Sequence, residues 1–186
     1  MSIDLHTHSI NSDGTLTPEE IIELATELQL EAISITDHEY LTEVENPANL
    51  KVINGVEVSA NWERLEVENK YAGVHLLVYY VDKSGPLNIR LEQVRNQKVE
   101  RNYKVLENLR NIDIDIKNTE LDSFKTKVPG RPHIAKLMVE KNYVSNISEA
   151  FIKYLGNGKI KDLNSHQLDI KEVVDLAKQS KSLIFL

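Results

Sequence analysis

Histidines and carboxylates gather in four places in the N-terminal half of the sequence: Asp4 to His8 with Asp13 behind them, Thr36 to His38, Gly55 to Val58, and His75. The most informative spacing is that of His6 and His8, because residues two apart in a strand project to the same side and can offer imidazole nitrogens to one ion. Nitrogen and carboxylate donors without a thiolate suit Mn, Fe or Zn rather than Ca or Mg. The pattern therefore predicts a site for a transition-metal ion.

Two carboxylates have the surroundings that such a site needs. Asp13 stands in a polar turn, where Gly14 allows the backbone to fold back toward the end of the preceding strand. Glu57 follows a glycine in an apolar run, and burying its carboxylate is costly unless a cation or hydrogen-bond donors compensate. Its two oxygens could bridge two cations. We expect each of the four clusters to lie at the end of a strand.

Each cluster also has a purely structural interpretation. A single histidine in an apolar strand, such as His75, is commonly a core or interface residue. Thr36 to His38 could form an ordinary turn, and Asp13 could serve only as a turn former. Taken together, the clusters favour the metal site, because chance rarely places so many donors at successive strand ends.

Composition limits the remaining function classes. The chain has 186 residues, 41% of them hydrophobic and 27% charged, with a net charge of −7, which predicts one soluble globular domain. The acidic balance argues against binding to nucleic acid through a basic face, so we expect no stable binding to duplex nucleic acid. The sequence contains no cysteine, which excludes thiolate zinc sites and cysteine nucleophiles and favours a reducing, cytoplasmic location.

No membrane or export segment is expected. The polar residues Met1 to Ser9 lack the apolar core of a signal peptide. The longest apolar stretch, Val74 to Val81, is far shorter than the ~20 residues of a spanning helix.

Short strands and helices alternate in the first part of the chain, which predicts a parallel α/β core. The helix after Thr17 has a capping residue, Pro18 in its first turn and Glu20 where a capping-box carboxylate belongs. The expected strands are Ile3 to Leu5, Ala32 to Thr36, Lys51 to Val58 and Val74 to Val81.

Further along, the pattern becomes helical. We expect helices at Leu87 to Arg110, Pro132 to Tyr143, Ser148 to Leu155 with Ser148 as the cap, and Asp169 to Gln179, and then a buried strand at Ser182 to Leu186. This order predicts an α/β part at residues 1–83, a helical insertion at residues 84–163 and a return to the α/β part at residues 164–186.

The four clusters resemble the motifs of the PHP family, named for polymerase and histidinol phosphatase domains. The matching stretches are Asp4-Leu5-His6-Thr7-His8-Ser9 with Ser12-Asp13-Gly14, Thr36-Asp37-His38, Gly55-Val56-Glu57-Val58-Ser59 and Val74-His75-Leu76-Leu77. Three further stretches are similar to the branch with 3',5'-nucleoside bisphosphate phosphatases and a 5'-to-3' exoribonuclease: Gly130 to Ala135, Val139 to Val144 and Tyr154 to Gly158.

The resemblance implies a distorted (β/α)7 TIM-like barrel with a helical insertion and up to three metal ions, with Mn expected ahead of Fe or Zn. It implies one ion at His6, His8 and Glu57, a second at Glu57 and His75, and a third at Asp13 and His38. It also implies that Arg131 and His133 approach the substrate phosphate; the alternative interpretation makes Arg131 the start of a surface helix. The reaction would be hydrolysis of a phosphate ester by a metal-activated water, with no protein nucleophile.

One feature departs from the family pattern. Relatives continue into an Ala-His-Pro motif and a Gly-Ser-Asp-Phe-His motif that supply three more ligands, whereas this chain stops at Leu186. We therefore expect a barrel that is incomplete at its C-terminus, whose open edge would make the chain unstable, lead it to self-associate or require a missing partner segment.

Three functions remain open at this point. The first is a metal-dependent phosphoesterase acting on 3',5'-nucleoside bisphosphates or short RNA, with histidinol phosphate as the alternative substrate. The second is a truncated domain that binds metal but is catalytically inactive. The third is a regulatory or interaction module, which gives no reason for retaining six correctly spaced ligands.

Overall fold

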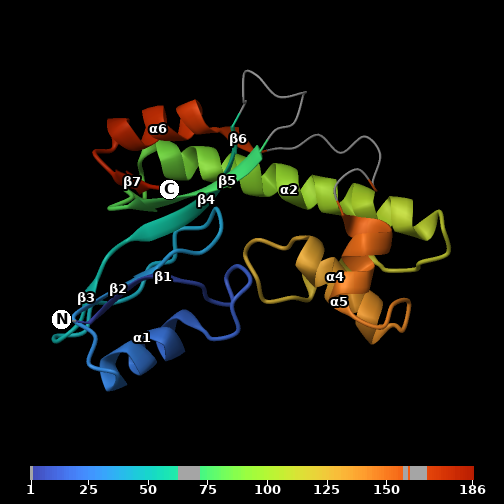
Figure 1. Cartoon of the computed structure of the whole chain (residues 1–186), viewed down its shortest axis with the longest axis horizontal. Helices are drawn as coiled ribbons and strands as arrows, with labels where there is room; N and C mark the ends of the chain where they lie inside the picture. The colour runs from blue at the N-terminus through green and yellow to red at the C-terminus, as the bar shows by residue number, and fades with distance from the viewer. Residues whose placement is uncertain (1, 63–71, 157–158, 160–166) are drawn as a thin grey trace. The chain divides into compact units, whose positions relative to one another are not determined.

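The computed structural model describes residues 2–62, 72–156, 159 and 167–186 (Figure 1). The chain divides into two compact units, Met1–Arg95 with Gln167–Leu186, and Asn96–His166. Each unit has apolar cores of its own. None of the described helices is both long and apolar enough to cross a membrane.

The first unit begins with a parallel sheet of three strands in the order β1-β2-β3, as expected for this part of the chain. The strands are β1 (Ile3–Thr7), β2 (Ala32–Ile35) and β3 (Lys51–Val52), and α1 (Pro18–Glu27) connects the first two. The predicted capping box of α1 is confirmed, because Glu20 N donates to Thr17 Oγ1 (3.2 Å) and Thr17 N donates to Glu20 Oε2 (2.7 Å). Apolar side chains of α1 and the sheet share one core, with Ile21, Ile22, Ala25, Ile33, Ile35 and Leu50 buried.

A second sheet in the same unit has the order β6-β4-β5-β7. Its strands are β4 (Gly55–Trp62), β5 (Ala72–Tyr79), β6 (Leu168–Asp169) and β7 (Leu183–Phe185). The expected all-parallel core is wrong here, because β5 runs antiparallel to β4 and β7 runs antiparallel to β5. Only residues 63–71 separate β4 from β5, and a parallel crossover needs about a dozen residues or more.

The expected strand Lys51 to Val58 is also wrong as a single element, because β3 and β4 belong to different sheets. The two sheets meet where the chain after β2 pairs with β4. Glu57 N donates to Asp37 O (3.2 Å), and Glu39 N donates to Glu57 O (2.8 Å). Gly55 permits this approach, because a Cβ there would lie 2.4 Å from Ser34 Oγ.

Two helices cover one face of the second sheet, α6 (Ile170–Gln179) and the first part of α2 (Pro86–Arg110). The core between these helices and the sheet is made of apolar side chains. Its members include Val56, Val58, Ala60, Leu76, Val78, Leu87, Leu91, Leu168, Val173 and Ala177.

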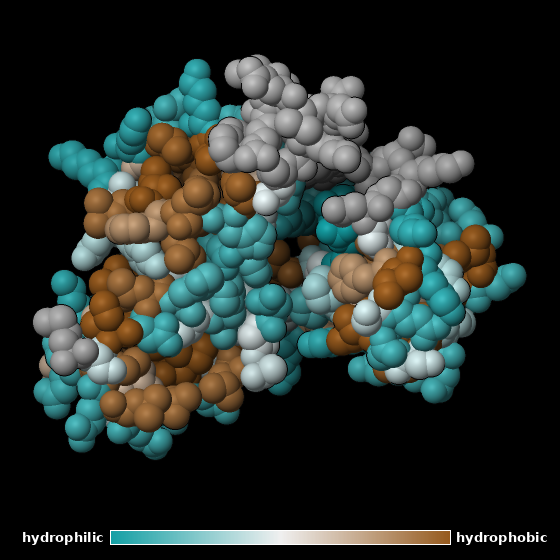
Figure 2. Space-filling model, in the orientation of Figure 1, coloured by the Kyte–Doolittle hydropathy of each residue, from teal (hydrophilic) through white to brown (hydrophobic). Residues whose placement is uncertain are grey.

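The terminal strand β7 differs from the expectation of a buried strand. Leu183 is 51% exposed and Phe185 is 54% exposed. Among the described strands β7 pairs only with β5, so it is an edge strand. Figure 2 shows apolar side chains on the surface over α6 and β7.

The second unit is helical. It holds the end of α2 with α3 (Asn118–Asp122), α4 (Arg131–Glu140), α5 (Ile147–Ala150) and η1, a π-helical turn (Phe151–Leu155). The expected cap at Ser148 is wrong, because α5 begins one residue earlier and Asn146 Oδ1 accepts the Glu149 N–H (2.9 Å). Asparagine at the N-cap satisfies a backbone donor of the first turn as well as serine does.

Candidate metal centre

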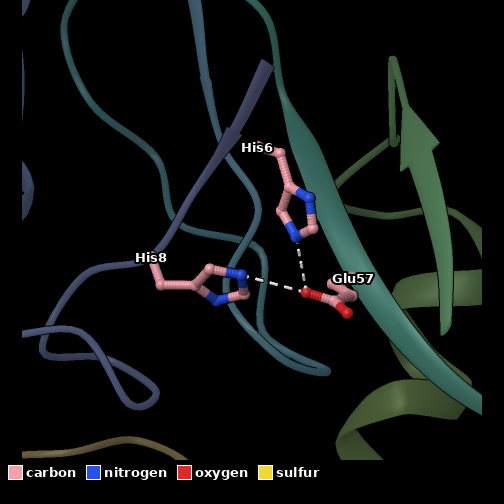
Figure 3. Close-up of side chains that lie close together, drawn as sticks. All are labelled: His6, His8 and Glu57. Atoms are coloured by element: carbon pink, nitrogen blue, oxygen red, sulfur yellow. Dashed lines mark hydrogen bonds and ion pairs between the residues drawn. The ribbon is translucent and has the colours of Figure 1, made fainter. Parts of the chain in front are cut away.

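The centre is built around the carboxylate of Glu57, which β4 carries almost completely buried. Two imidazoles converge on it, with His6 Nε2 at 2.9 Å and His8 Nε2 at 3.0 Å from the same oxygen, Oε2 (Figure 3). His75 Nδ1 contacts the other oxygen, Oε1. One carboxylate therefore faces nitrogen ligands on both of its oxygens.

The histidine pair comes from β1 and the residue just beyond it, and both rings turn toward β4, as the spacing predicts. A side chain of the other sheet holds β1 in place. The hydroxyl of Tyr79 in β5 donates to Leu5 O (2.7 Å), and Leu5 directly precedes His6. This contact links the backbone beside His6 to the sheet that carries Glu57.

Asp13 and His38 complete the set on the other side of His8. Asp13 Oδ1 lies 3.5 Å from His8 Nδ1, and Asp13 Oδ2 lies 3.6 Å from His38 Nε2. The turn that brings Asp13 back depends on Gly14, whose N–H donates to Ser9 O (3.0 Å). A Cβ at position 14 would lie 2.1 Å from His8 O, so the turn accepts only glycine.

The donor atoms fit metal ions. Three groups each place their ligand atoms within 4.8 Å of one another: His6, His8 and Glu57; His8, Asp13 and His38; and His38, Glu57 and His75. Donors bound at about 2.1 Å to one ion lie roughly 3 Å apart, which matches the contacts around Glu57 Oε2. His38 Nδ1 is buried without a hydrogen-bond partner and lies 3.8 Å from Glu57 Oε2. A metal ion bound beside Glu57 would give this nitrogen the partner that it lacks.

The electrostatics of the centre favour ionised carboxylates. Burial alone would raise the pKa of Glu57, but hydrogen bonds with His8 and His6 and the nearby His38 hold that pKa well below its usual range. The contact with His38 lowers the pKa of Asp13 to about 2, against the effect of partial burial. Burial works to lower the pKa of His38, yet the neighbouring Asp13 and Glu57 outweigh it and raise that pKa. The carboxylates are thus already in the form that binds metal.

Two of these positions correct the expectation that every cluster lies at a strand end. Glu57 is the third residue of β4, and His75 lies in the middle of β5. Glu57 reaches the centre because the beginning of β4 pairs with the chain after β2, and His75 does so because β5 passes β4 in the opposite direction. The side chain of His75 is 53% exposed, so it is not a core histidine.

Arg131 and His133 lie at the start of α4 in the second unit. His133 is buried, its Nδ1 accepts the Gly130 N–H (3.2 Å), and its ring packs edge-on against Phe124. Arg131 Nη1 donates to Leu155 O (3.0 Å), and burial lowers the pKa of Arg131. Both side chains thus have structural contacts within their own unit, and their role at a substrate phosphate stays a prediction.

Sequence reasoning missed the role of Asp37, which it placed in a possible turn. Its carboxylate is completely buried and accepts hydrogen bonds from Ser9, Ser12 and Thr42. The available signal was the position of the serines, since Ser9 follows one predicted ligand and Ser12 precedes another.

Several curated relatives of the chain carry names of nucleic-acid or nucleotide hydrolases. The chain is 29% identical over 181 residues to a 5'-3' exoribonuclease of Haemophilus influenzae, covering 92% of this chain and 63% of the relative. It is 29% identical over 191 residues to the 5'-3' exoribonuclease Rnm of Escherichia coli (95% and 61%). It is 31% identical over 174 residues to a 3',5'-nucleoside bisphosphate phosphatase of Chromobacterium violaceum (85% and 56%). The chain therefore spans about three fifths of the length of these relatives.

Solved structures share the fold. An amidohydrolase from Chromobacterium violaceum, with bound sulfate and no metal, superposes with a TM-score of 0.79 at 25% identity, covering 99% of this chain and 66% of that one. A protein from Bifidobacterium adolescentis described as a metal-dependent phosphoesterase gives 0.77 at 23% identity, covering 98% and 65%. These superpositions confirm the predicted α/β fold class.

A sequence model of one family, the PHP domain, matches residues 4–166, a range that contains all six residues of the metal centre. The match covers most of the 186 residues, and the resemblance of the four motifs to this family is confirmed. The chain belongs to the PHP domain family.

Proposed function

We propose that this chain is a metal-dependent phosphoesterase that hydrolyses phosphate esters of nucleotides, with 3',5'-nucleoside bisphosphates or short RNA as substrates. The observation that carries the proposal is the convergence of His6, His8, His38 and His75 on the buried carboxylate of Glu57. Such a carboxylate has no structural need for four imidazoles, whereas a metal centre uses all of them.

Bound divalent ions would supply Lewis-acid activation of water and neutralise charge on the phosphate. The protein's part is to hold the donors in place and in the right ionisation state. Glu57 and Asp13 are ionised at neutral pH, and the surrounding histidines keep the pKa of each below its usual range against the effect of burial. The exposed rings of His6 and His75 border solvent, so a phosphate ester can reach this side of the centre.

The substrate class comes from the relatives. Those with the broadest coverage carry names that specify 5'-3' exoribonuclease activity, and another is named as a 3',5'-nucleoside bisphosphate phosphatase. Both substrates carry a phosphate on a nucleoside 5' or 3' oxygen, so one metal centre could serve either. We propose Mn as the first metal to test, since the mixed nitrogen and oxygen donors suit it.

The test measures metal binding and turnover separately on the same purified chain. Bound Mn, Fe and Zn are quantified, and phosphate release from 3'-phosphoadenosine 5'-phosphate and mononucleotide release from a short 5'-phosphorylated RNA are followed with added Mn. We expect Mn-dependent release that His8→Ala abolishes and that Glu23→Gln, an exposed carboxylate of α1, leaves unchanged. Metal binding without release from either substrate would instead show a metal-binding domain that is catalytically inactive.

A further inference from the structure

Asp37 is a buried carboxylate that belongs to none of the three donor groups. Each of its oxygens accepts two hydrogen bonds. Oδ1 accepts the Ser9 N–H (2.8 Å) and the Ser12 hydroxyl (2.6 Å). Oδ2 accepts the Ser9 hydroxyl (2.6 Å) and the Thr42 hydroxyl (2.5 Å). The carboxylate is therefore satisfied by neutral donors and has no need of a cation of its own.

Two of the three partners of Asp37 are sequence neighbours of metal-ligand candidates. Ser9 directly follows His8, and Ser12 directly precedes Asp13. The Ser12 hydroxyl also lies 3.4 Å from His8 Nδ1. One carboxylate thus fixes both ends of the short segment that joins two ligands of the His8, Asp13 and His38 group.

The same residue reaches two further members of the centre, His38 and Glu57, through the backbone. His38 is its neighbour in sequence, and the Asp37 carbonyl accepts the Glu57 N–H (3.2 Å). Thr42 extends the network, because its hydroxyl also accepts a hydrogen bond from Asn11 Nδ2 (3.0 Å) in the middle of the segment. Asp37 is in this way connected to the backbone of four of the six candidate ligands.

We propose that Asp37 is a positioning residue of the metal centre, which holds the segment from His8 to Asp13 in the conformation that binds an ion together with His38. Three hydrogen bonds from the segment to one buried side chain tie it to the chain after β2, so this network rigidifies the segment before metal arrives. The inference rests on the metal-dependent function proposed above, but only on its metal-binding part.

Two substitutions separate position from charge. Asp37→Asn keeps the shape, because its amide oxygen can accept from Ser9 N and Ser12 while its amide nitrogen donates to the Ser9 and Thr42 hydroxyls, which can rotate to accept. Asp37→Ala removes the acceptor and leaves these donors without a partner on that side. A positioning role predicts that asparagine rescues the function and alanine does not.

The experiment measures Mn affinity and stoichiometry by calorimetry on the whole chain, together with histidine ring resonances of the metal-free protein by NMR. We expect Asp37→Ala to weaken Mn binding by about 10- to 100-fold and to shift the ring signals of His8 and His38. We expect Asp37→Asn to bind Mn within a few-fold of the unmodified chain, since its network is retained. Asn102→Ala, which truncates a buried polar side chain of the second unit, controls for a general loss of stability.

Equal Mn binding by Asp37→Ala and the unmodified chain would overturn the inference, and so would equal losses in the alanine and asparagine variants, because the second result would assign the effect to charge. If Asp37→Ala does not fold, Ser12→Ala takes its place, and an unchanged Mn affinity in that variant would overturn the inference. Mn binding without turnover by the unmodified chain would contradict the phosphoesterase proposal and leave this inference standing.

Discussion

At the Glu57 carboxylate, four imidazoles lie around two oxygen atoms. Among the described residues, Glu57 is the one carboxylate that belongs to two donor groups, and its Oε2 faces His6 and His8 while its Oε1 faces His75. The loss of this one side chain should therefore affect more than one ion.

The substitution Glu57→Gln tests this directly. The amide keeps the size of the side chain but binds metal weakly and places a donor where a negative charge is needed, so we expect Mn affinity to fall by about 100-fold or more. We also expect the number of bound ions to decrease. Calorimetric titration and metal analysis of the purified variant measure both quantities.

The matched control is Glu23→Gln, which makes the same chemical change on an exposed turn of α1. It should bind Mn like the unmodified chain. A Glu57→Gln variant that retained full Mn affinity would remove Glu57 from the centre.

At this scale, the sequence predicted all six donors that the fold brings together. His6 and His8 could be predicted because alternation along a strand is a local property. The role of Asp37 was missed although Ser9 and Ser12 flank predicted ligands, because its hydrogen bonds join residues 28 and 25 positions apart and form only when the segment after β1 packs against the chain after β2.

Among the elements, the junction of the two sheets at Gly55 decides where Glu57 lies. A Cβ at this position would lie 2.4 Å from Ser34 Oγ, 3.0 Å from Thr36 Cγ2 and 3.1 Å from Tyr79 Cδ1. We expect Gly55→Ala to lower the free energy of unfolding by about 1–3 kcal/mol, because the buried Ser34 and Thr36 side chains, or the strands beside them, must shift. Urea unfolding monitored by circular dichroism measures this change.

Gly73→Ala is the control from the neighbouring strand β5, where a Cβ would meet only Gln167 Nε2 at 3.9 Å. Its free energy of unfolding should stay within about 0.5 kcal/mol of the unmodified value. Equal free energies of unfolding for the two alanine variants would show that the junction of the sheets does not require glycine at position 55.

The capping box of α1 offers a second prediction for an element. Thr17→Ala removes the acceptor of the Glu20 N–H, and we expect a loss of about 1 kcal/mol in the free energy of unfolding. Thr26→Ala removes a hydroxyl in the same helix that bonds only to Ile22 O, and alanine favours the helix there, so no loss is expected. An equal loss in both variants, measured by urea unfolding, would argue against a capping contribution.

The elements also show where sequence patterns stop being sufficient. The alternation of strands and helices correctly predicted the parallel pairing of β1, β2 and β3. It failed for β4 and β5, where the direction of pairing depends on the length of the connection rather than on the pattern within either strand. It failed again for β7, since the apolar residues Leu183 and Phe185 lie on an edge strand, and a run of apolar letters does not distinguish an edge from a core.

In the whole molecule, all six candidate metal ligands belong to the unit formed by Met1–Arg95 and Gln167–Leu186. Ligand binding stabilises a folded unit by about 2.7 kcal/mol when free ligand is about 100 times its Kd. We therefore expect added Mn to slow amide hydrogen exchange at Val56 and Val58 of this unit by up to about 100-fold. Exchange at Ile134 and Met138 of the other unit should change much less.

Hydrogen exchange followed by mass spectrometry measures both sets of amides in one experiment. His8→Ala should remove the response of Val56 and Val58 to Mn. Equal slowing in the two units would show instead that they unfold as a single cooperative body.

The three donor groups form a closed ring, in which His8, His38 and Glu57 each belong to two groups. No group can bind an ion without using side chains that another group also uses. The metal affinity of each group therefore depends on whether its neighbours are occupied. An ion in one group orders the shared ligands for its neighbours and also repels their ions, and these two effects act in opposite directions on the next binding step. If the groups bind metal as proposed, loading is a linked equilibrium, and its titration curve reports the balance of ordering against repulsion rather than the affinity of any single position.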